Sequence, residues 1–74
     1  MKRYNKKVII TGALGQDGRI LSEIYIKNKF NVTGIVKNTK KKIKGVKYYK
    51  TTLNNFISLS KILNKIEPDI FIHL

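Results

Sequence analysis

The chain has 74 residues, no cysteine and a formal net charge of +12. A chain of this length forms at most one small domain and buries only about 60% of the surface that its unfolded form exposes. The lack of cysteine excludes disulfide bonds and thiolate metal sites. No apolar run reaches the about 7–15 residues of a secretory signal or the roughly 20 of a membrane span. We therefore expect one domain over residues 1–74, no membrane partner, and a cytoplasmic location.

The positive charge is carried almost entirely by lysine. The sequence has 14 lysines and 2 arginines, together with 12 isoleucines and 7 asparagines, a bias similar to that of an AT-rich genome. Arginine, the residue best suited to reading bases and phosphates with two parallel hydrogen bonds, is nearly absent. Charge of this kind predicts only non-specific attraction to polyanions. We therefore do not expect nucleic acid to be the dedicated partner.

Short apolar runs and amphipathic segments alternate along the chain. The runs are rich in β-branched residues, which is typical of buried parallel strands. The strand candidates are Val8–Thr11, Val32–Val36, Ile70–Leu74 and, more weakly, Val46–Tyr49. The helix candidates are Gln16–Lys29 and Phe56–Ile66, the second with Asn55 as its N-cap and Pro68 just beyond its end. This order predicts an α/β fold with a parallel sheet.

The last strand candidate has no covering helix after it. Parallel strands are normally buried on both faces, and Ile70–Leu74 ends the chain. We therefore expect the chain to be the front part of a longer protein.

The segment TGALGQDG, residues 11–18, follows the first predicted strand and opens the first predicted helix. In a dinucleotide-binding fold, Gly12 makes the tight turn, Gly15 lets the backbone approach a pyrophosphate, and Gly18 lets the helix pack closely on the sheet. The N–H groups at the start of the helix bind the anion. We expect the side chain of Asp17 to point away from it, toward the positive end of the helix dipole. The alternative is that the three glycines serve only the turn.

The residue after the second predicted strand bears on the choice of cofactor. An acidic residue about 20 positions beyond the glycines binds the ribose 2′-OH of NAD in such folds. This chain has Lys37 there, and a cation favours the 2′-phosphate of NADP. Lys37 also begins the lysine-rich run at 37–45, whose plain interpretation is a solvated loop. NAD therefore stays open as an alternative.

These residues resemble the extended short-chain dehydrogenase/reductases that modify nucleotide sugars. Residues 11–18 fit the TGxxGxxG signature of that family, and the Gln16–Asp17 pair is similar to its GDP-mannose 4,6-dehydratase branch in particular. Three further segments resemble the family, namely GIVKN at 34–38, GVKYYKTTLNN at 45–55 and EPDIFIHL at 67–74. The resemblance covers residues 7–74.

The sequence departs from the family pattern in two places. The family's Asp-Leu-x-Asp motif, whose first aspartate contacts adenine, has Thr52 and Asn55 in place of its two acids. A threonine hydroxyl still forms hydrogen bonds but is a weaker acceptor than a carboxylate. Lys37 and Asn38 replace two arginines, so a two-point contact with phosphate becomes a single charge.

The resemblance implies a partial Rossmann-type sheet of about four strands with two helices, the N-terminal half of an NAD(P)-binding domain. The cofactor would be NADP, and the implied cofactor-binding residues are Thr11, Gly12, Gly15, Gln16, Asp17, Gly18, Lys37, Thr52 and Leu53. In the complete enzyme it implies conversion of GDP-mannose to GDP-4-keto-6-deoxymannose, and a homo-oligomer. Hydride leaves C4, water is lost across C5–C6, and hydride returns to C6.

The family's catalytic residues would lie beyond Leu74, so we expect no catalytic residue and no turnover in this chain. Tyr25 and Lys29 have the spacing of the family's Tyr-x-x-x-Lys pair, but they fall within the first predicted helix. His73 is the single histidine; we assign it no catalytic role and expect no metal site. Two alternatives stay open: part of another NAD(P)-dependent nucleotide-sugar epimerase or reductase, and a non-enzymatic basic chain that binds nucleotides or RNA.

Overall fold

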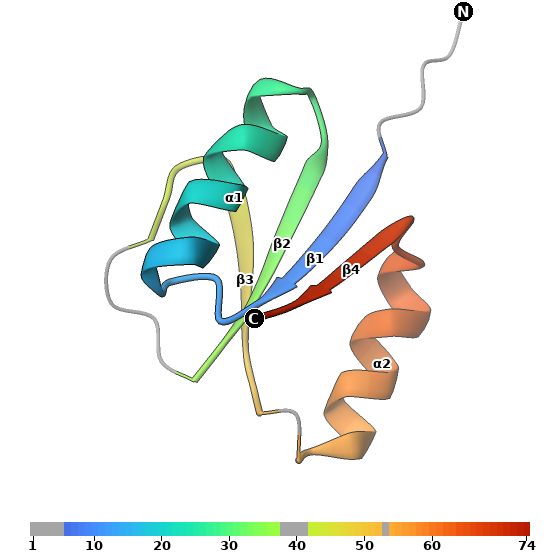
Figure 1. Ribbon diagram of the computed structural model, residues 1–74. Coiled ribbons are helices and arrows are strands. Elements are labelled where there is room, and N and C mark those ends of the chain that lie inside the picture. The colour runs from blue at the N-terminus through green and yellow to red at the C-terminus, as the bar shows by residue number, and fades with distance from the viewer. Residues whose placement is uncertain (1–5, 38–41, 53) are drawn as a thin grey trace, which may run out of the picture.

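The computed structural model describes residues 6–37, 42–52 and 54–74. Within these residues a four-stranded parallel sheet lies between two helices (Figure 1). The elements in chain order are β1 (Lys7–Thr11), α1 (Gln16–Lys27), β2 (Asn31–Val36), β3 (Val46–Lys50), α2 (Phe56–Ile66) and β4 (Ile70–His73). Every predicted element is present, with small differences at the ends. In the same residues, neither helix is long and apolar enough to cross a membrane.

The strand order in the described sheet is β3-β2-β1-β4. This is the order of the corresponding strands in a Rossmann fold, which confirms the predicted partial Rossmann-type sheet. The register pairs Thr11 of β1 with Ile35 of β2 and with His73 of β4. The carboxyl ends of these strands therefore lie side by side at one edge of the sheet.

Strand β1 lies in the interior of the sheet and is buried on both faces. Val8, Ile9 and Ile10 are each 0% exposed, which explains why this segment is a continuous apolar run rather than an alternating one. Burial of a side chain of this size stabilises the folded state by about 1.5–3 kcal/mol. These three residues alone therefore contribute an amount comparable with the net stability of about 5–15 kcal/mol of a whole domain.

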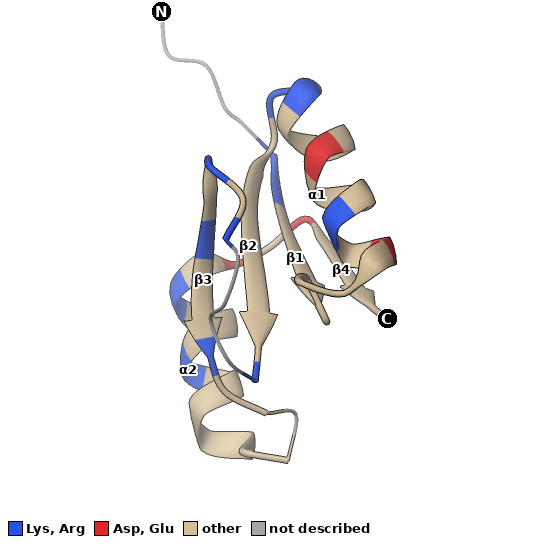
Figure 2. Cartoon of the chain, turned by 90° about the vertical axis from the view of Figure 1, so that its left-hand side faces the viewer, with Lys and Arg blue, Asp and Glu red and all other residues tan. Residues whose placement is uncertain are grey.

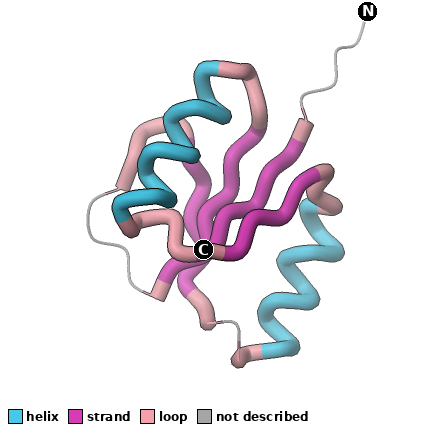
Figure 3. The backbone as a smooth tube through the Cα atoms, in the orientation of Figure 1, coloured by secondary structure: helices cyan, strands magenta, loops and turns pink. Residues whose placement is uncertain are grey.

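The two helices cover opposite faces of the sheet, as Figures 2 and 3 show from two directions. On one face, Leu21, Tyr25 and Ile26 of α1 pack against a cluster that includes Val8 and Ile10. On the other face, α2 contributes its apolar stripe to a cluster built on Ile9 and Ile35; the α2 residues are Leu59, Ile62, Leu63 and Ile66. Both amphipathic patterns in the sequence thus face the core.

Helix α1 ends two residues earlier than the sequence pattern predicts. Lys29 adopts the left-handed conformation, with φ of 67°. Its N–H group donates to the carbonyl of Ile26 at 3.0 Å, and the N–H group of Phe30 donates to the carbonyl of Tyr25 at 3.0 Å. These two bonds form a Schellman motif, and the rings of Tyr25 and Phe30, 4.8 Å apart, make the apolar contact that accompanies it.

Helix α2 has a side-chain cap at its start and a tight exit into β4. The side chain of Asn55 accepts a hydrogen bond from the N–H group of Ser58 at 3.1 Å, which confirms its predicted role as N-cap. Glu67 ends the helix in the left-handed conformation. Two hydrogen bonds of 2.8 Å then join Asp69 to the backbone of Lys7, so the starts of β4 and β1 are held together.

Candidate functional site

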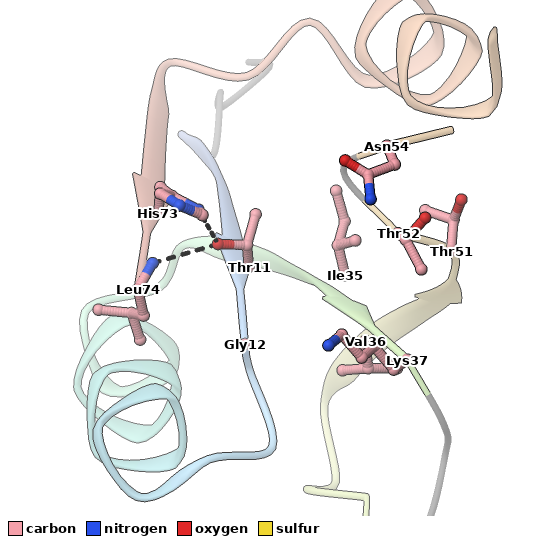
Figure 4. Close-up of a pocket in the computed structure, with 10 residues that line it drawn as sticks. All are labelled: Thr11, Gly12, Ile35, Val36, Lys37, Thr51, Thr52, Asn54, His73 and Leu74. Carbon is pink, nitrogen blue, oxygen red and sulfur yellow. Dashed lines mark hydrogen bonds between the residues drawn. The ribbon is translucent and has the colours of Figure 1, made fainter. Parts of the chain in front are cut away.

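A cavity of about 500 Å³ lies at the carboxyl edge of the sheet. The ends of β1, β2 and β4 and the segment after β3 surround it (Figure 4). The residues that line it are Thr11, Gly12, Ile35, Val36, Lys37, Thr51, Thr52, Asn54, His73 and Leu74. Ligands of open parallel sheets bind outside the carboxyl ends of the strands, so this is the edge at which a binding site is expected.

A second hollow, of about 330 Å³, lies at the start of α1. It is lined by Gly12, Gly15, Gln16, Asp17, Gly18 and Leu74. Because both hollows share Gly12 and Leu74, they form one candidate site that extends from the start of α1 to the ends of β2 and β3. Eight of the nine residues predicted to bind the cofactor line this site, and the ninth, Leu53, lies outside the described residues.

The loop from β1 to α1 leaves the first N–H groups of the helix open to the second hollow. Gly12 has a φ of +66°, a conformation that favours glycine, and its N–H group donates to the carbonyl of Ile35 at 3.1 Å. Gly15 then donates to the carbonyl of Gly12 at 3.0 Å. Gly15 is the N-cap of α1, and no side chain caps the helix there. The first N–H groups of a helix have no acceptor within the helix, so they are available to an anion in this hollow.

The glycines of this loop differ in what the fold requires of them. A Cβ at Gly18 would collide with the carbonyl oxygen of Gly12 and lie 2.7 Å from the Cα of Ala13. Gly18 is therefore required by the packing of α1. A Cβ at Gly15 would meet nothing closer than the carbonyl oxygen of Gly12 at 3.4 Å, and its φ of −74° suits any residue. Packing within the described chain therefore accounts for Gly18 but not for Gly15.

Thr11 connects the end of β1 to the end of β4 (Figure 4). Its side chain is almost fully buried, at 4% exposed. The hydroxyl oxygen accepts a hydrogen bond from the N–H group of Leu74 at 3.1 Å and lies 2.9 Å from Nδ1 of His73. These contacts give Thr11 and His73 a structural role at the rim of the cavity, whatever either residue contributes to a ligand.

The polar residues of the larger cavity come from the ends of β2 and β3. Lys37 follows the last residue of β2 and is exposed, as are Thr52 and Asn54. Asn38, the second position that replaces a family arginine, lies outside the described residues. Lys37 is therefore the described cation that lines the cavity.

Several residues of the site were not predicted from the sequence. Thr51 and Asn54 flank the predicted positions Thr52 and Leu53. Ile35 and Val36 are the last two residues of β2. The rule that ligands lie at the carboxyl ends of parallel strands could have found all four. Leu74 reaches the site because β4 pairs with β1, and the local sequence carries no signal for that pairing.

Two patterns in the sequence fall outside the site. Tyr25 lies on α1 and its ring packs against Phe30. The Tyr25–Lys29 spacing therefore belongs to the C-terminal end of this helix and not to a catalytic pair. Asn55, on the second acidic position of the family motif, caps α2. Because Asn and Asp are similarly good N-caps, the replacement of that acid leaves the start of the helix intact. Among the described residues, no group of three or more His, Cys, Asp and Glu side chains could hold a metal ion.

A family model places the chain in a known group. The model of the NAD dependent epimerase/dehydratase family matches residues 8–74, nearly the whole chain. The chain therefore belongs to this family.

Solved structures with the same fold include several enzymes. The Bordetella bronchiseptica enzyme WbmH, solved in complex with NAD+, is 22% identical with a TM-score of 0.83, and the match covers 96% of this chain and 26% of that one. UDP-glucose 4-epimerase from Thermotoga maritima, solved with UDP-glucose, is 18% identical with a TM-score of 0.83 over 92% and 23% of the two chains. A short chain dehydrogenase from Leptospira borgpetersenii with bound NAD+ is 26% identical with a TM-score of 0.76 over 93% and 30%.

The chain spans about a quarter of the length of these solved structures. No curated protein sequence matches it significantly. The comparisons thus establish the family and the fold.

The hydrogen bonds of Thr11 lead to a testable expectation. In Thr11→Val, the partly buried N–H group of Leu74 loses its acceptor, so we expect the free energy of unfolding to fall by about 1–2 kcal/mol. Urea unfolding followed by circular dichroism measures this change. Thr52→Val, at an exposed position, is the matched control and should stay within about 0.5 kcal/mol of the unaltered chain. Equal losses in the two variants would contradict the structural role of Thr11.

Proposed function

We propose that the chain is the dinucleotide-binding part of an NADP-dependent enzyme similar to GDP-mannose 4,6-dehydratase. The observation that carries the proposal is the bare backbone at Gly15, beside the uncapped start of α1. The fold leaves room for a Cβ there, and a ligand that lies against the backbone would explain its absence. A pyrophosphate group is such a ligand, since it needs both close approach and free N–H groups.

The rest of the site fits the two ends of a dinucleotide. The hollow at α1 suits the pyrophosphate, and the larger cavity, with Lys37 and Thr52 on its lining, suits the adenosine half. Asp17 lies in the first turn of α1 and is among the residues that line the hollow; the helix dipole there stabilises its carboxylate. No residue of this chain is proposed as catalytic; the chain holds and orients the cofactor.

Two features of the sequence support the finer parts of the proposal. Lys37 places a positive charge beside the end of β2, where the adenosine ribose lies in this fold, and so favours the 2′-phosphate of NADP. The Gln16–Asp17 pair supports the GDP-mannose 4,6-dehydratase branch through the resemblance described above. GDP-mannose as substrate and self-association of the complete enzyme rest on that resemblance.

An NAD-dependent nucleotide-sugar epimerase is the second candidate. It is favoured by the NAD+ bound to WbmH and to the Leptospira dehydrogenase. The single exposed cation at Lys37, in place of two arginines, also makes a weaker phosphate contact than the family pattern gives. Comparison of NADPH with NADH therefore separates the two candidates.

Gly15→Ala tests the proposed pyrophosphate site. The added methyl group would lie where the cofactor approaches the backbone, so we expect the Kd for NADPH to rise about tenfold or more. The free energy of unfolding should change by less than about 1 kcal/mol, because alanine restricts the unfolded chain but is a poorer N-cap residue than glycine. Fluorescence titration with NADPH and urea unfolding measure the two effects.

Gly18→Ala is the matched control for this variant. Its Cβ collides with the β1–α1 loop, so we expect the free energy of unfolding to fall by about 1–3 kcal/mol. Unchanged NADPH affinity in Gly15→Ala would contradict the proposal, because it would mean that no ligand lies against that backbone.

Lys37→Gln tests the preference for NADP. Loss of one exposed charge beside the 2′-phosphate should raise the Kd for NADPH about two- to fivefold and leave that for NADH unchanged. Lys42→Gln, an exposed position outside the lining of the cavity, should change neither. Tighter binding of NADH than of NADPH by the unaltered chain would favour the epimerase candidate instead.

A further inference from the structure

A third hollow lies at the opposite edge of the sheet from the proposed cofactor site. It has a volume of about 250 Å³ and is lined by Lys7, Asn31, Thr33, Lys47, Tyr49, Lys65 and Ile66. Lys7 and Asn31 are the first residues of β1 and β2, and Ile66 is the last residue of α2. The hollow, called the lysine hollow below, is therefore at the amino edge of the sheet, on the face that α2 covers.

Three lysines from three separate elements converge on the lysine hollow. Lys7 comes from β1, Lys47 from β3 and Lys65 from α2, and Figure 2 shows basic positions on both β3 and α2. No acidic side chain is among its described lining residues. Asp69 lies near Lys7, but its carboxylate accepts a hydrogen bond from the Lys7 backbone N–H group. Three like charges around one cavity repel each other, and an anion between them would relieve that repulsion.

Thr33 gives an independent indication that a polar ligand fits this hollow. The residue is only 6% exposed, and it lies on the same face of β2 as Ile35, toward α2. Among the described residues its hydroxyl has no hydrogen-bond partner. No buried side-chain oxygen of the described residues lacks a partner, so this hydroxyl is open to the hollow, where it can donate to an acceptor. In the lysine hollow, that acceptor would come from the ligand.

Tyr49 defines the position of one of the three charges. The ammonium nitrogen of Lys65 lies 6.0 Å from the centroid of the Tyr49 ring, within reach of a cation–π contact. Such a contact leaves the N–H groups of the ammonium free to donate to another partner. Lys65 thus lies beside the hollow with its donors available.

We propose that the lysine hollow binds a phosphate or pyrophosphate group, with Lys7, Lys47 and Lys65 as the cations and the Thr33 hydroxyl as a hydrogen-bond donor. Lysine binds phosphate as a point charge, and three of them match the multiple negative charge of this ligand better than the single charge of a carboxylate. The volume of the hollow equals that of several water molecules, at about 30 Å³ each, and is sufficient for such a group. The phosphate belongs either to a free phosphorylated molecule or to a nucleic-acid backbone.

Titration of the ¹⁵N-labelled chain with inorganic pyrophosphate tests this proposal. We expect saturable NMR shifts at the amides of Thr33, Lys47 and Lys65, which are separate from any shifts at the start of α1. Thr33→Val, which keeps the shape of the side chain but removes the donor, should raise the Kd at this site about tenfold. The double variant Lys47→Gln/Lys65→Gln should raise it about three- to tenfold.

Lys27→Gln/Lys29→Gln is the matched control, because it removes the same charge at the end of α1, beyond the other face of the sheet. It should leave the Kd at the lysine hollow nearly unchanged. An equal loss in the control and in the lysine-hollow variant, no saturation, or no effect of Thr33→Val would each overturn the proposal. A parallel titration with a single-stranded oligonucleotide distinguishes the sources. Tighter binding of the oligonucleotide at the same amides identifies a nucleic-acid backbone, and tighter binding of pyrophosphate identifies a free phosphorylated molecule.

Discussion

The position of the candidate site depends on the close approach of α1 to the sheet, which is made around one alanine. Ala13 is 0% exposed and lies between Gly34 of β2 and Gly18 of α1. A Cβ at Gly34 would lie 2.6 Å from the Cβ of Ala13, and a Cβ at Gly18 would lie 2.7 Å from its Cα. Real Cβ atoms do not approach other atoms this closely, so both positions require glycine. This packing fixes the start of α1 at the carboxyl edge of β1, and the N–H groups of the helix are thereby aimed at one place.

The two edges of the sheet differ in how they present charge. At the carboxyl edge, the backbone supplies the donors, through the first turn of α1, and Lys37 adds a single cation. At the amino edge, side chains supply the charge, through the three lysines of the lysine hollow. A dinucleotide needs close backbone contact, which only the first arrangement provides. The net charge of +12 is therefore compatible with a dinucleotide site and does not by itself point to nucleic acid.

The sequence predicted the elements and most of the site because its signals were local. The apolar run Val8–Thr11, the glycine spacing at 11–18 and the cap at Asn55 each act within a few residues. Positions that depend on contacts far along the chain were missed. Leu74 joins the site through the pairing of β4 with β1, and the lysine hollow combines Lys7 and Lys65, which are distant in sequence. The early end of α1 was missed for another reason. The left-handed position after a helix is usually glycine, which marks the helix end in the sequence, but here the residue is Lys29.

The central claim is that the turn after β1 and the start of α1 bind the pyrophosphate of a nicotinamide dinucleotide. The most direct measurement is an NMR titration of the ¹⁵N-labelled chain with NADPH. The account predicts saturable shifts that are largest at the amides of residues 12 and 15–18, with further shifts at Lys37 and Thr52. Shifts confined to exposed lysines, without saturation and lost at moderate salt, would contradict it, because they would mark non-specific attraction to a polyanion.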